Sequence, residues 1–142
     1  MKFVLVFLAL AAGSAALATP CAYYPRKSKQ LGCASNGYLM RFGYRYCAKF
    51  LREEREYTPA GQRFMQAIRP CLIQNLEVRS NIDCRNVKAL AERTHVRCYL
   101  QNGFCQLPEA DKVRLFVSVW PEIFDPGFNA VIGQIQRACD GH

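Results

Sequence analysis

The chain has 142 residues, a formal net charge of +8 and eight cysteines. This length fits one small domain with a limited core, in which cross-links add stability. An even number of cysteines in a short exported chain is typical of a disulfide framework, and the sequence has no CxxC, HExxH or Cys/His cluster that would indicate zinc or thioredoxin-type chemistry. The positive charge favours anionic partners such as glycosaminoglycans, with simple solubility as the alternative.

The first eighteen residues have the features of a secretion signal. Residues 1–2 give a short basic start, residues 3–12 are apolar, and residues 16–18 supply the small side chains of a cleavage site. The alternative, a membrane helix, would need a longer apolar stretch. We therefore predict a signal peptide over residues 1–18, followed by one secreted, extracellular, disulfide-rich helical domain over residues 19–142. This domain should have no transmembrane segment. Nucleic acid is not an expected partner, because the chain has no recognisable binding motif.

Residues 19–37 are predicted to be irregular, since Pro20, Pro25, Gly32 and Gly37 interrupt a regular pattern. From residue 39 to about residue 56, apolar residues recur at steps of three and four, which predicts an amphipathic helix. Basic residues recur at the same steps on another face of this helix. This basic stripe consists of Arg41, Arg45, Lys49 and Arg52. It is the best electrostatic candidate for a partner-binding surface, and an ordinary solvated helix face is the alternative.

Two helices are predicted in the middle of the chain. Thr58 and Pro59 form a helix-start signal, with Thr58 as the N-cap and Pro59 in the first turn. Pro70 should kink or end that helix, because proline lacks the N–H that a helix interior needs. A second helix is predicted to begin at Asp83 and to stop at Gly103.

Two further helices are predicted towards the C-terminus. The first opens near Pro108 with an inward face formed by Val113, Phe116, Val117 and Trp120. The second opens with the cap-plus-proline signal at residues 125–126, and its apolar side consists of Phe128, Val131, Ile132, Ile135 and Cys139. No strand-like alternation extends over a useful length. The predicted fold class is therefore all-α, with about five helices in one disulfide-stapled domain.

The sequence offers little support for catalysis. His95 lies in the middle of a predicted helix and His142 is the last residue, and no motif places a nucleophile beside either. The cluster of Glu53, Glu54 and Glu56 is interleaved with arginines, which indicates ion pairs at a helix end and not the paired carboxylates of a glycosidase. No EF-hand pattern is present. We expect no enzyme activity, no catalytic residues, no metal site and no cofactor.

The cysteine spacing indicates a family. From Cys47 onward, successive cysteines are separated by 24, 13, 14, 7 and 34 residues. This ladder resembles that of the stanniocalcins, which are secreted helical glycoprotein hormones. Short segments are similar as well, at residues 46–51 (YCAKFL), 57–64 (YTPAGQRF), 98–105 and 108–110. The resemblance extends over about residues 44–139.

The family's disulfide pairing, carried over by position, gives a specific expectation. The implied pairs are Cys21–Cys47, Cys33–Cys84, Cys71–Cys98 and Cys105–Cys139, one of 105 pairings that eight cysteines allow. The chain departs from the family in lacking an additional N-terminal cysteine pair, an N-glycan acceptor motif and the tail cysteine that joins two chains. The segment between Cys71 and Cys84 is also shorter, by about one helical turn. A covalent homodimer is therefore not expected, and a non-covalent dimer stays open.

The resemblance implies a secreted hormone or regulatory protein that acts by binding another extracellular protein. That partner would be a receptor or a secreted metalloproteinase of the pappalysin type, in calcium or phosphate homeostasis. One alternative is an exported effector or toxin-like scaffold, motivated by the short length, the missing glycan and the positive charge. Another is a carrier for a small hydrophobic ligand in a cavity between helices. The carrier is suggested by Phe64, Phe116, Trp120 and Phe128, which would fit an ordinary core equally well.

Overall fold

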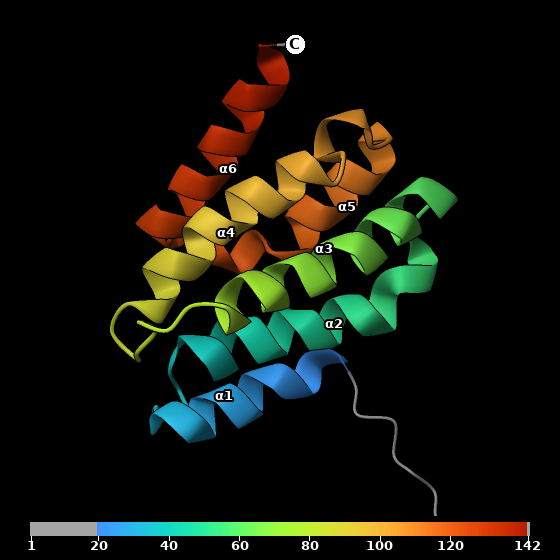
Figure 1. Ribbon diagram of the computed structural model, residues 1–142. Coiled ribbons are helices and arrows are strands. Elements are labelled where there is room, and N and C mark those ends of the chain that lie inside the picture. Colours follow the sequence, from blue (N-terminus) through green and yellow to red (C-terminus); the bar gives the residue numbers. More distant parts are fainter. Residues whose placement is uncertain (1–19, 142) are drawn as a thin grey trace, which may run out of the picture.

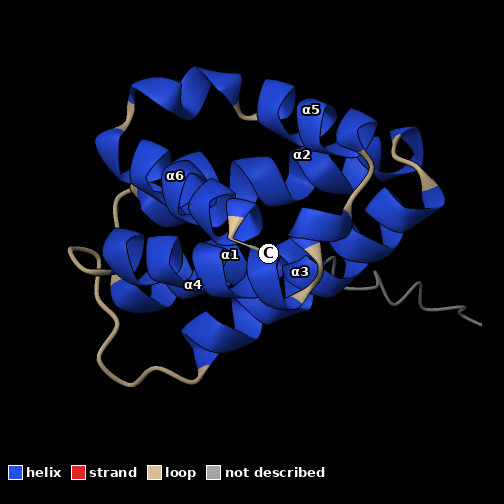
Figure 2. Ribbon diagram, turned by 90° about the horizontal axis from the view of Figure 1, so that it is seen from above, coloured by secondary structure: helices blue, strands red, loops and turns tan. Residues whose placement is uncertain are grey.

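The computed structural model describes residues 20–141, and over these residues every regular element is helical (Figure 2). The helices are α1 (Tyr23–Leu31), α2 (Arg45–Glu53), α3 (Pro59–Glu77), α4 (Val87–Gln101), α5 (Glu109–Ser118) and α6 (Pro126–Asp140). Short helical turns connect them: η1 (Pro20–Ala22), the π-helical η2 (Leu39–Tyr44), η3 (Glu54–Glu56), η4 (Phe104–Gln106) and η5 (Trp120–Phe124). The all-α prediction is confirmed, with six helices in place of about five. The predicted signal peptide lies outside the described residues.

The first four helices follow one another across the molecule in chain order, and α6 lies beyond α4 (Figure 1). Helix α4 contacts α3 on one side and α6 on the other, so it is the central element. At the opposite edge, α1 packs against η2. This close approach requires Gly43, because a Cβ at that position would overlap the ring of Tyr24.

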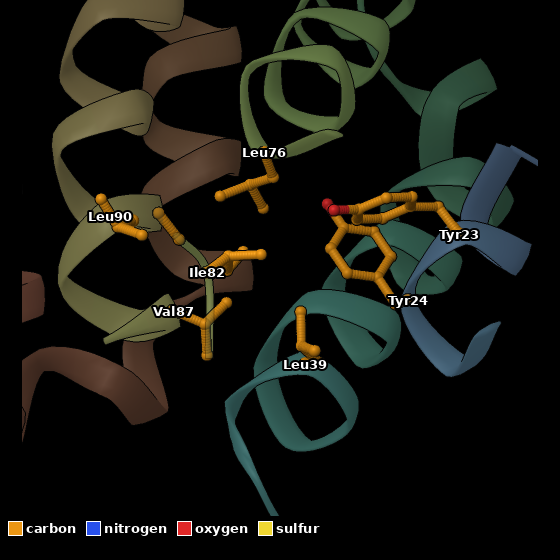
Figure 3. Packing of buried hydrophobic residues seen from close by; sticks show 8 residues of the cluster. Tyr23, Tyr24, Leu39, Leu76, Ile82, Val87 and Leu90 are labelled. Carbon is orange, nitrogen blue, oxygen red and sulfur yellow. The ribbon is translucent and has the colours of Figure 1, made fainter. Parts of the chain in front are cut away.

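The main core cluster lies where α1, η2, α3 and α4 meet (Figure 3). Tyr23 and Tyr24 extend from α1 with their rings edge to face, and Leu76 of α3 belongs to the same cluster. The other members are Leu39, Ile82, Val87, Leu90 and Ala91. A second cluster joins α3 to η4 and α5, and it consists of Tyr57, Phe64, Met65, Ile68, Leu107 and Leu115.

Four disulfides cross-link the helices and leave no free cysteine among the described residues. Cys21–Cys47 joins η1 to α2, and Cys33–Cys84 joins the segment after α1 to the turn before α4. Cys71–Cys98 joins α3 to α4, and Cys105–Cys139 joins η4 to α6. This is the pairing that the resemblance to the stanniocalcins implies.

The predicted irregular segment at residues 19–37 is wrong, because most of it forms α1. Pro25 occupies the first turn of this helix, where a missing N–H costs nothing. Gly32 adopts a left-handed conformation with φ of 67° and ends the helix as its C-cap. The residues that we interpreted as breakers are therefore the start and stop signals of a nine-residue helix.

Both cap-plus-proline signals are confirmed, and Pro70 does not end its helix. Thr58 caps α3 by accepting a hydrogen bond from the Gly61 N–H, and Asp125 caps α6 in the same way with Phe128. Helix α3 continues past Pro70 to Glu77. Because Pro70 has no N–H, the carbonyl four residues earlier lacks its usual helical hydrogen bond. Both residues are solvent-exposed, so water can donate to that carbonyl.

Helix α4 begins at Val87, four residues after the predicted start at Asp83. The Asp83 carboxylate accepts hydrogen bonds from the backbone N–H groups of Arg85 and Asn86, each at 2.8 Å. These bonds form a side-chain-stabilised turn ahead of the helix, which is the usual role of an aspartate in that position. The predicted stop is confirmed, since α4 ends two residues before Gly103.

The predicted inward face of α5 is wrong for Val117 and Trp120, and Val113 and Phe116 line a cavity in place of packing into the core. Val113, Phe116 and Val117 are 53%, 39% and 62% exposed, and Trp120, in η5, is 51% exposed. The residues of α5 that are buried against the rest of the molecule are Asp111 and Leu115, one turn apart. A hydrophobic pattern could not reveal this face, because half of it is a carboxyl group.

Candidate functional site

A partly open cavity of about 750 Å³ lies between α2, α3, α4, α5 and α6. One wall is a row of aromatic residues that recur every four residues, from Tyr38, just before η2, through Phe42 of η2 to Tyr46 and Phe50 of α2. Tyr38 stacks on Phe42 with ring centres 5.2 Å apart, and Phe42 lies 4.8 Å from Tyr46. Because residues four apart share a helix face, this row presents one continuous aromatic surface to the cavity.

The other walls are mainly aliphatic. Helix α6 contributes Phe128, Ile132 and Ile135, and α3 contributes Met65, Ile68 and Leu72. Helix α4 adds Ala91, His95 and Tyr99. A cavity of this size with predominantly apolar walls is within the range of small-molecule sites, about 300–1,000 Å³.

His95 is the least ordinary residue of the cavity wall. Its Nδ1 lies 2.7 Å from the carbonyl oxygen of Ala91, one helical turn earlier. A carbonyl only accepts, so Nδ1 carries the proton and Nε2 is the acceptor of a neutral imidazole. Burial lowers the pKa of His95 more than the hydrogen bond to Ala91 raises it, which keeps the ring neutral at physiological pH. No hydrogen bond to Nε2 is found among residues 20–141.

Two phenol groups accompany His95 in the cavity wall. Tyr99 follows one turn later on α4 with its ring 6.0 Å from the imidazole, and Tyr38 stands in the opposite aromatic row. Burial raises the pKa of both phenols well above the ordinary value, so both stay protonated. Neither hydroxyl makes a hydrogen bond within the described part of the chain.

Charged side chains at the rim of the cavity largely neutralise one another. Lys88 forms an ion pair with Asp125 at 2.5 Å and lies 3.8 Å from Glu92. Arg41 lines the same cavity and makes no ion pair within 4.0 Å among residues 20–141. Arg69, Lys112, Glu109, Glu122 and Asp140 line the cavity as well, so four cations stand with five carboxylates and the cavity offers no strong net attraction to an ion of either sign.

The four residues of the basic stripe lie on η2 and α2, and they differ in their surroundings. Arg45 is 4.0 Å from Glu122, and Lys49 is 3.5 Å from Glu53. Arg41 and Arg52 are exposed and have no carboxylate within ion-pair distance among residues 20–141. The stripe therefore retains two uncompensated charges, one at each end.

A buried carboxyl that the sequence did not point to fixes α5 against α3. Asp111 is 2% exposed, and its carboxyl accepts hydrogen bonds from the Thr58 N–H at 3.0 Å and the Thr58 hydroxyl at 2.5 Å. Thr58 in turn caps α3, so one pair of side chains connects the starts of two helices. With no second titratable or nucleophilic group bonded to it, this pair has a structural role.

Of the four residues that suggested a carrier, Phe116 and Phe128 line the cavity. Phe64 is buried in the second core cluster instead, and Trp120 lies outside the cavity with its ring against Phe116 at 5.1 Å. Over residues 20–141, no three His, Cys, Asp or Glu side chains come together as a metal site. None of the helices in this part of the chain combines the length and apolar character needed to cross a membrane.

Comparison with known proteins gives no relative. No protein-family model matches the chain, and neither a curated protein nor a solved structure matches it. Membership of the stanniocalcin family therefore stays a prediction from the cysteine spacing and the short segments described above.

Proposed function

We propose that the protein is a secreted, stanniocalcin-like regulator that acts by binding another extracellular protein. The observation that carries the proposal is the connectivity of the four disulfides. All four join the cysteines that the resemblance pairs, although eight cysteines allow 105 arrangements. Cross-links of this density are typical of small domains that function in oxidising, extracellular conditions.

The proposed mode of action is occupation of a partner's surface without chemistry of its own. A secreted metalloproteinase of the pappalysin type is the partner that the resemblance implies. Its inhibition would serve the regulation of calcium or phosphate.

The direct test uses the protein secreted from cells, with its four disulfides verified by non-reducing peptide mapping. Added to a purified pappalysin-type metalloproteinase, it should form a complex that survives gel filtration and lower the rate of cleavage of the enzyme's protein substrate. Correctly cross-linked protein that neither binds nor inhibits such an enzyme, and that binds no cell-surface receptor, would contradict the proposal.

The basic stripe is the proposed contact surface. Reversing the two uncompensated charges, Arg41→Glu with Arg52→Glu, should weaken partner binding and reduce its dependence on salt. The matched control is Arg63→Glu with Arg93→Glu, two exposed arginines outside the stripe that also lack an ion pair among residues 20–141. Equal binding by the two double variants would show that the stripe is only a solvated helix face.

A further inference from the structure

We infer that the cavity between the aromatic row and α6 binds an uncharged apolar molecule that carries a hydroxyl group, of the size of a sterol or a terpenoid alcohol. This inference does not depend on the proposed regulatory function. It rests on the cavity's volume, on its apolar walls and on the unpartnered polar atoms that those walls contain.

The first step concerns the size of the cavity and the character of its walls. Protein interiors are packed about as densely as organic crystals, and the voids that exist are few and small. The space of about 750 Å³ beside the main core cluster is far larger than such voids, and being partly open it is of the size and kind that binds small molecules. Walls built from Phe42, Phe128, Ile132 and Ile135 give water few hydrogen-bonding partners, so an apolar occupant gains more there than water does.

The second step concerns the polar atoms. Nε2 of His95 is an acceptor with no partner among residues 20–141, in a half-buried ring that lines the cavity. Whatever occupies the cavity therefore decides whether this acceptor is hydrogen-bonded, and a donor placed there would satisfy it. A ligand hydroxyl would donate its proton to Nε2. The phenols of Tyr38 and Tyr99, also unpartnered, could then donate to the oxygen of the same hydroxyl.

The third step excludes charged ligands as the preferred class. A fatty-acid carboxylate would need an uncompensated cation inside the cavity or a strongly positive rim. Lys88 is already paired with Asp125 and Glu92, and two cations line the cavity without an ion pair among residues 20–141: the exposed Arg41, and Lys112, whose ammonium donates to the Cys105 carbonyl. Carboxylates of Glu109, Glu122 and Asp140 line the cavity as well, so its charges give no positive excess. A neutral histidine also offers a carboxylate no proton and no charge. An alcohol fits the available groups better than an anion does.

The experiment measures binding of dehydroergosterol, a fluorescent sterol with one hydroxyl group, to the disulfide-intact protein. Trp120 is the chain's single tryptophan and packs against Phe116 of the cavity wall. We therefore expect saturable energy transfer from Trp120 to the sterol at one site per chain. The 3-methyl ether of the same sterol, which cannot donate to Nε2, should bind about tenfold more weakly.

Two variants separate binding in the cavity from binding elsewhere, with sterol anisotropy as the readout. His95→Phe keeps a ring but removes the acceptor, so it should abolish the preference for the alcohol over the ether. Ile132→Trp fills the cavity and should weaken binding of both sterols more than tenfold. Its control, Val78→Trp, adds the same ring at a position that is 82% exposed and outside the cavity, and it should bind normally.

Three outcomes would overturn the inference. The first is the absence of saturable sterol binding, including the case in which the protein sediments as a dimer whose second copy covers the cavity. The second is tighter binding of oleate than of the sterol, which would make the ligand an anion. The third is an unchanged alcohol-to-ether ratio in His95→Phe, or normal binding by Ile132→Trp, since either would place the sterol away from the groups proposed to hold it.

Discussion

The two sides of α4 are stabilised in different ways. On the side of α1 and α3, the tyrosines of α1 and the aliphatic residues of the main cluster pack tightly, and Cys33–Cys84 closes the same region. On the side of α5 and α6, several apolar residues stay exposed or face the cavity. That side is held by Cys105–Cys139, by Asp111 with Thr58, and by Lys88 with Asp125.

The difference shows how a small domain can keep an internal space. Apolar packing alone would close a gap between helices, because each buried methylene contributes about 0.8 kcal/mol. Covalent and polar links fix α5 and α6 near their ends, in addition to the packing of Leu115, Val131 and Ile135. The other apolar residues of these helices can then line a cavity, and a ligand site can persist there.

Two leucine-to-alanine substitutions, one on each side, test this contrast, and they include the largest expected effect on stability. Leu90→Ala, in the packed cluster, should lower the free energy of unfolding by about 2–5 kcal/mol. Leu72→Ala, on the cavity wall, should cost only about 1 kcal/mol, because that leucine already borders open space and loses fewer contacts. Chemical denaturation followed by circular dichroism measures both. Equal losses would mean that the cavity wall is as tightly packed as the core.

The sequence predicted those parts of the fold that depend on local chemistry. The helix starts at Thr58 and Asp125 are set by side chains that cap the adjacent turn. The inward face of α5 could not be predicted, since the buried residue is Asp111, whose partner lies 53 positions earlier in the chain. Likewise, α1 was missed because the proline and glycine at its two ends also occur in irregular segments.

The candidate site was predictable only in part. The row of Tyr38, Phe42, Tyr46 and Phe50 has a spacing of four that is visible in the sequence, although such a row usually belongs to a core. Whether it faces packed side chains or a cavity depends on how far α6 stands from α2, and no local pattern encodes that distance. His95 had no motif, and its open Nε2 follows from the hydrogen bond to Ala91 and from its surroundings.

An intermediate effect is expected from the polar link that replaces apolar packing at α5. Asp111→Ala should lower the free energy of unfolding by about 2–3 kcal/mol, because it leaves the Thr58 N–H and hydroxyl without their partner. The control Glu109→Ala removes an exposed carboxylate from the first turn of the same helix and should cost about 0.5 kcal/mol. Thermal unfolding at neutral pH would measure both. Similar costs for the two variants would show that the buried link contributes little.

The smallest expected effect on the free energy of unfolding comes from protonation of His95, and its sign follows from the lowered pKa of that residue. The unfolded chain binds a proton near the ordinary histidine pKa of about 6.5, whereas the folded chain resists protonation because the ring is buried beside Phe42 and Tyr99. Stability from this group is therefore complete above about pH 6.5 and is lost as pH falls toward the folded pKa. The slope cannot exceed about 1.4 kcal/mol per pH unit for one proton.

Carboxylates act in a different pH range, which makes the histidine contribution measurable. Hydrogen bonding from Lys88 lowers the pKa of Asp125, so the stability that this carboxylate adds is lost only below about pH 4, under the ordinary aspartate value. Between pH 7.5 and pH 5, urea denaturation should thus show falling stability in the wild-type protein and a flatter profile in His95→Phe. Parallel profiles would mean that His95 is protonated as readily in the folded chain as in the unfolded one. The ring would then be open to water, and Nε2 would already be hydrated in place of waiting for a hydroxyl group of a ligand.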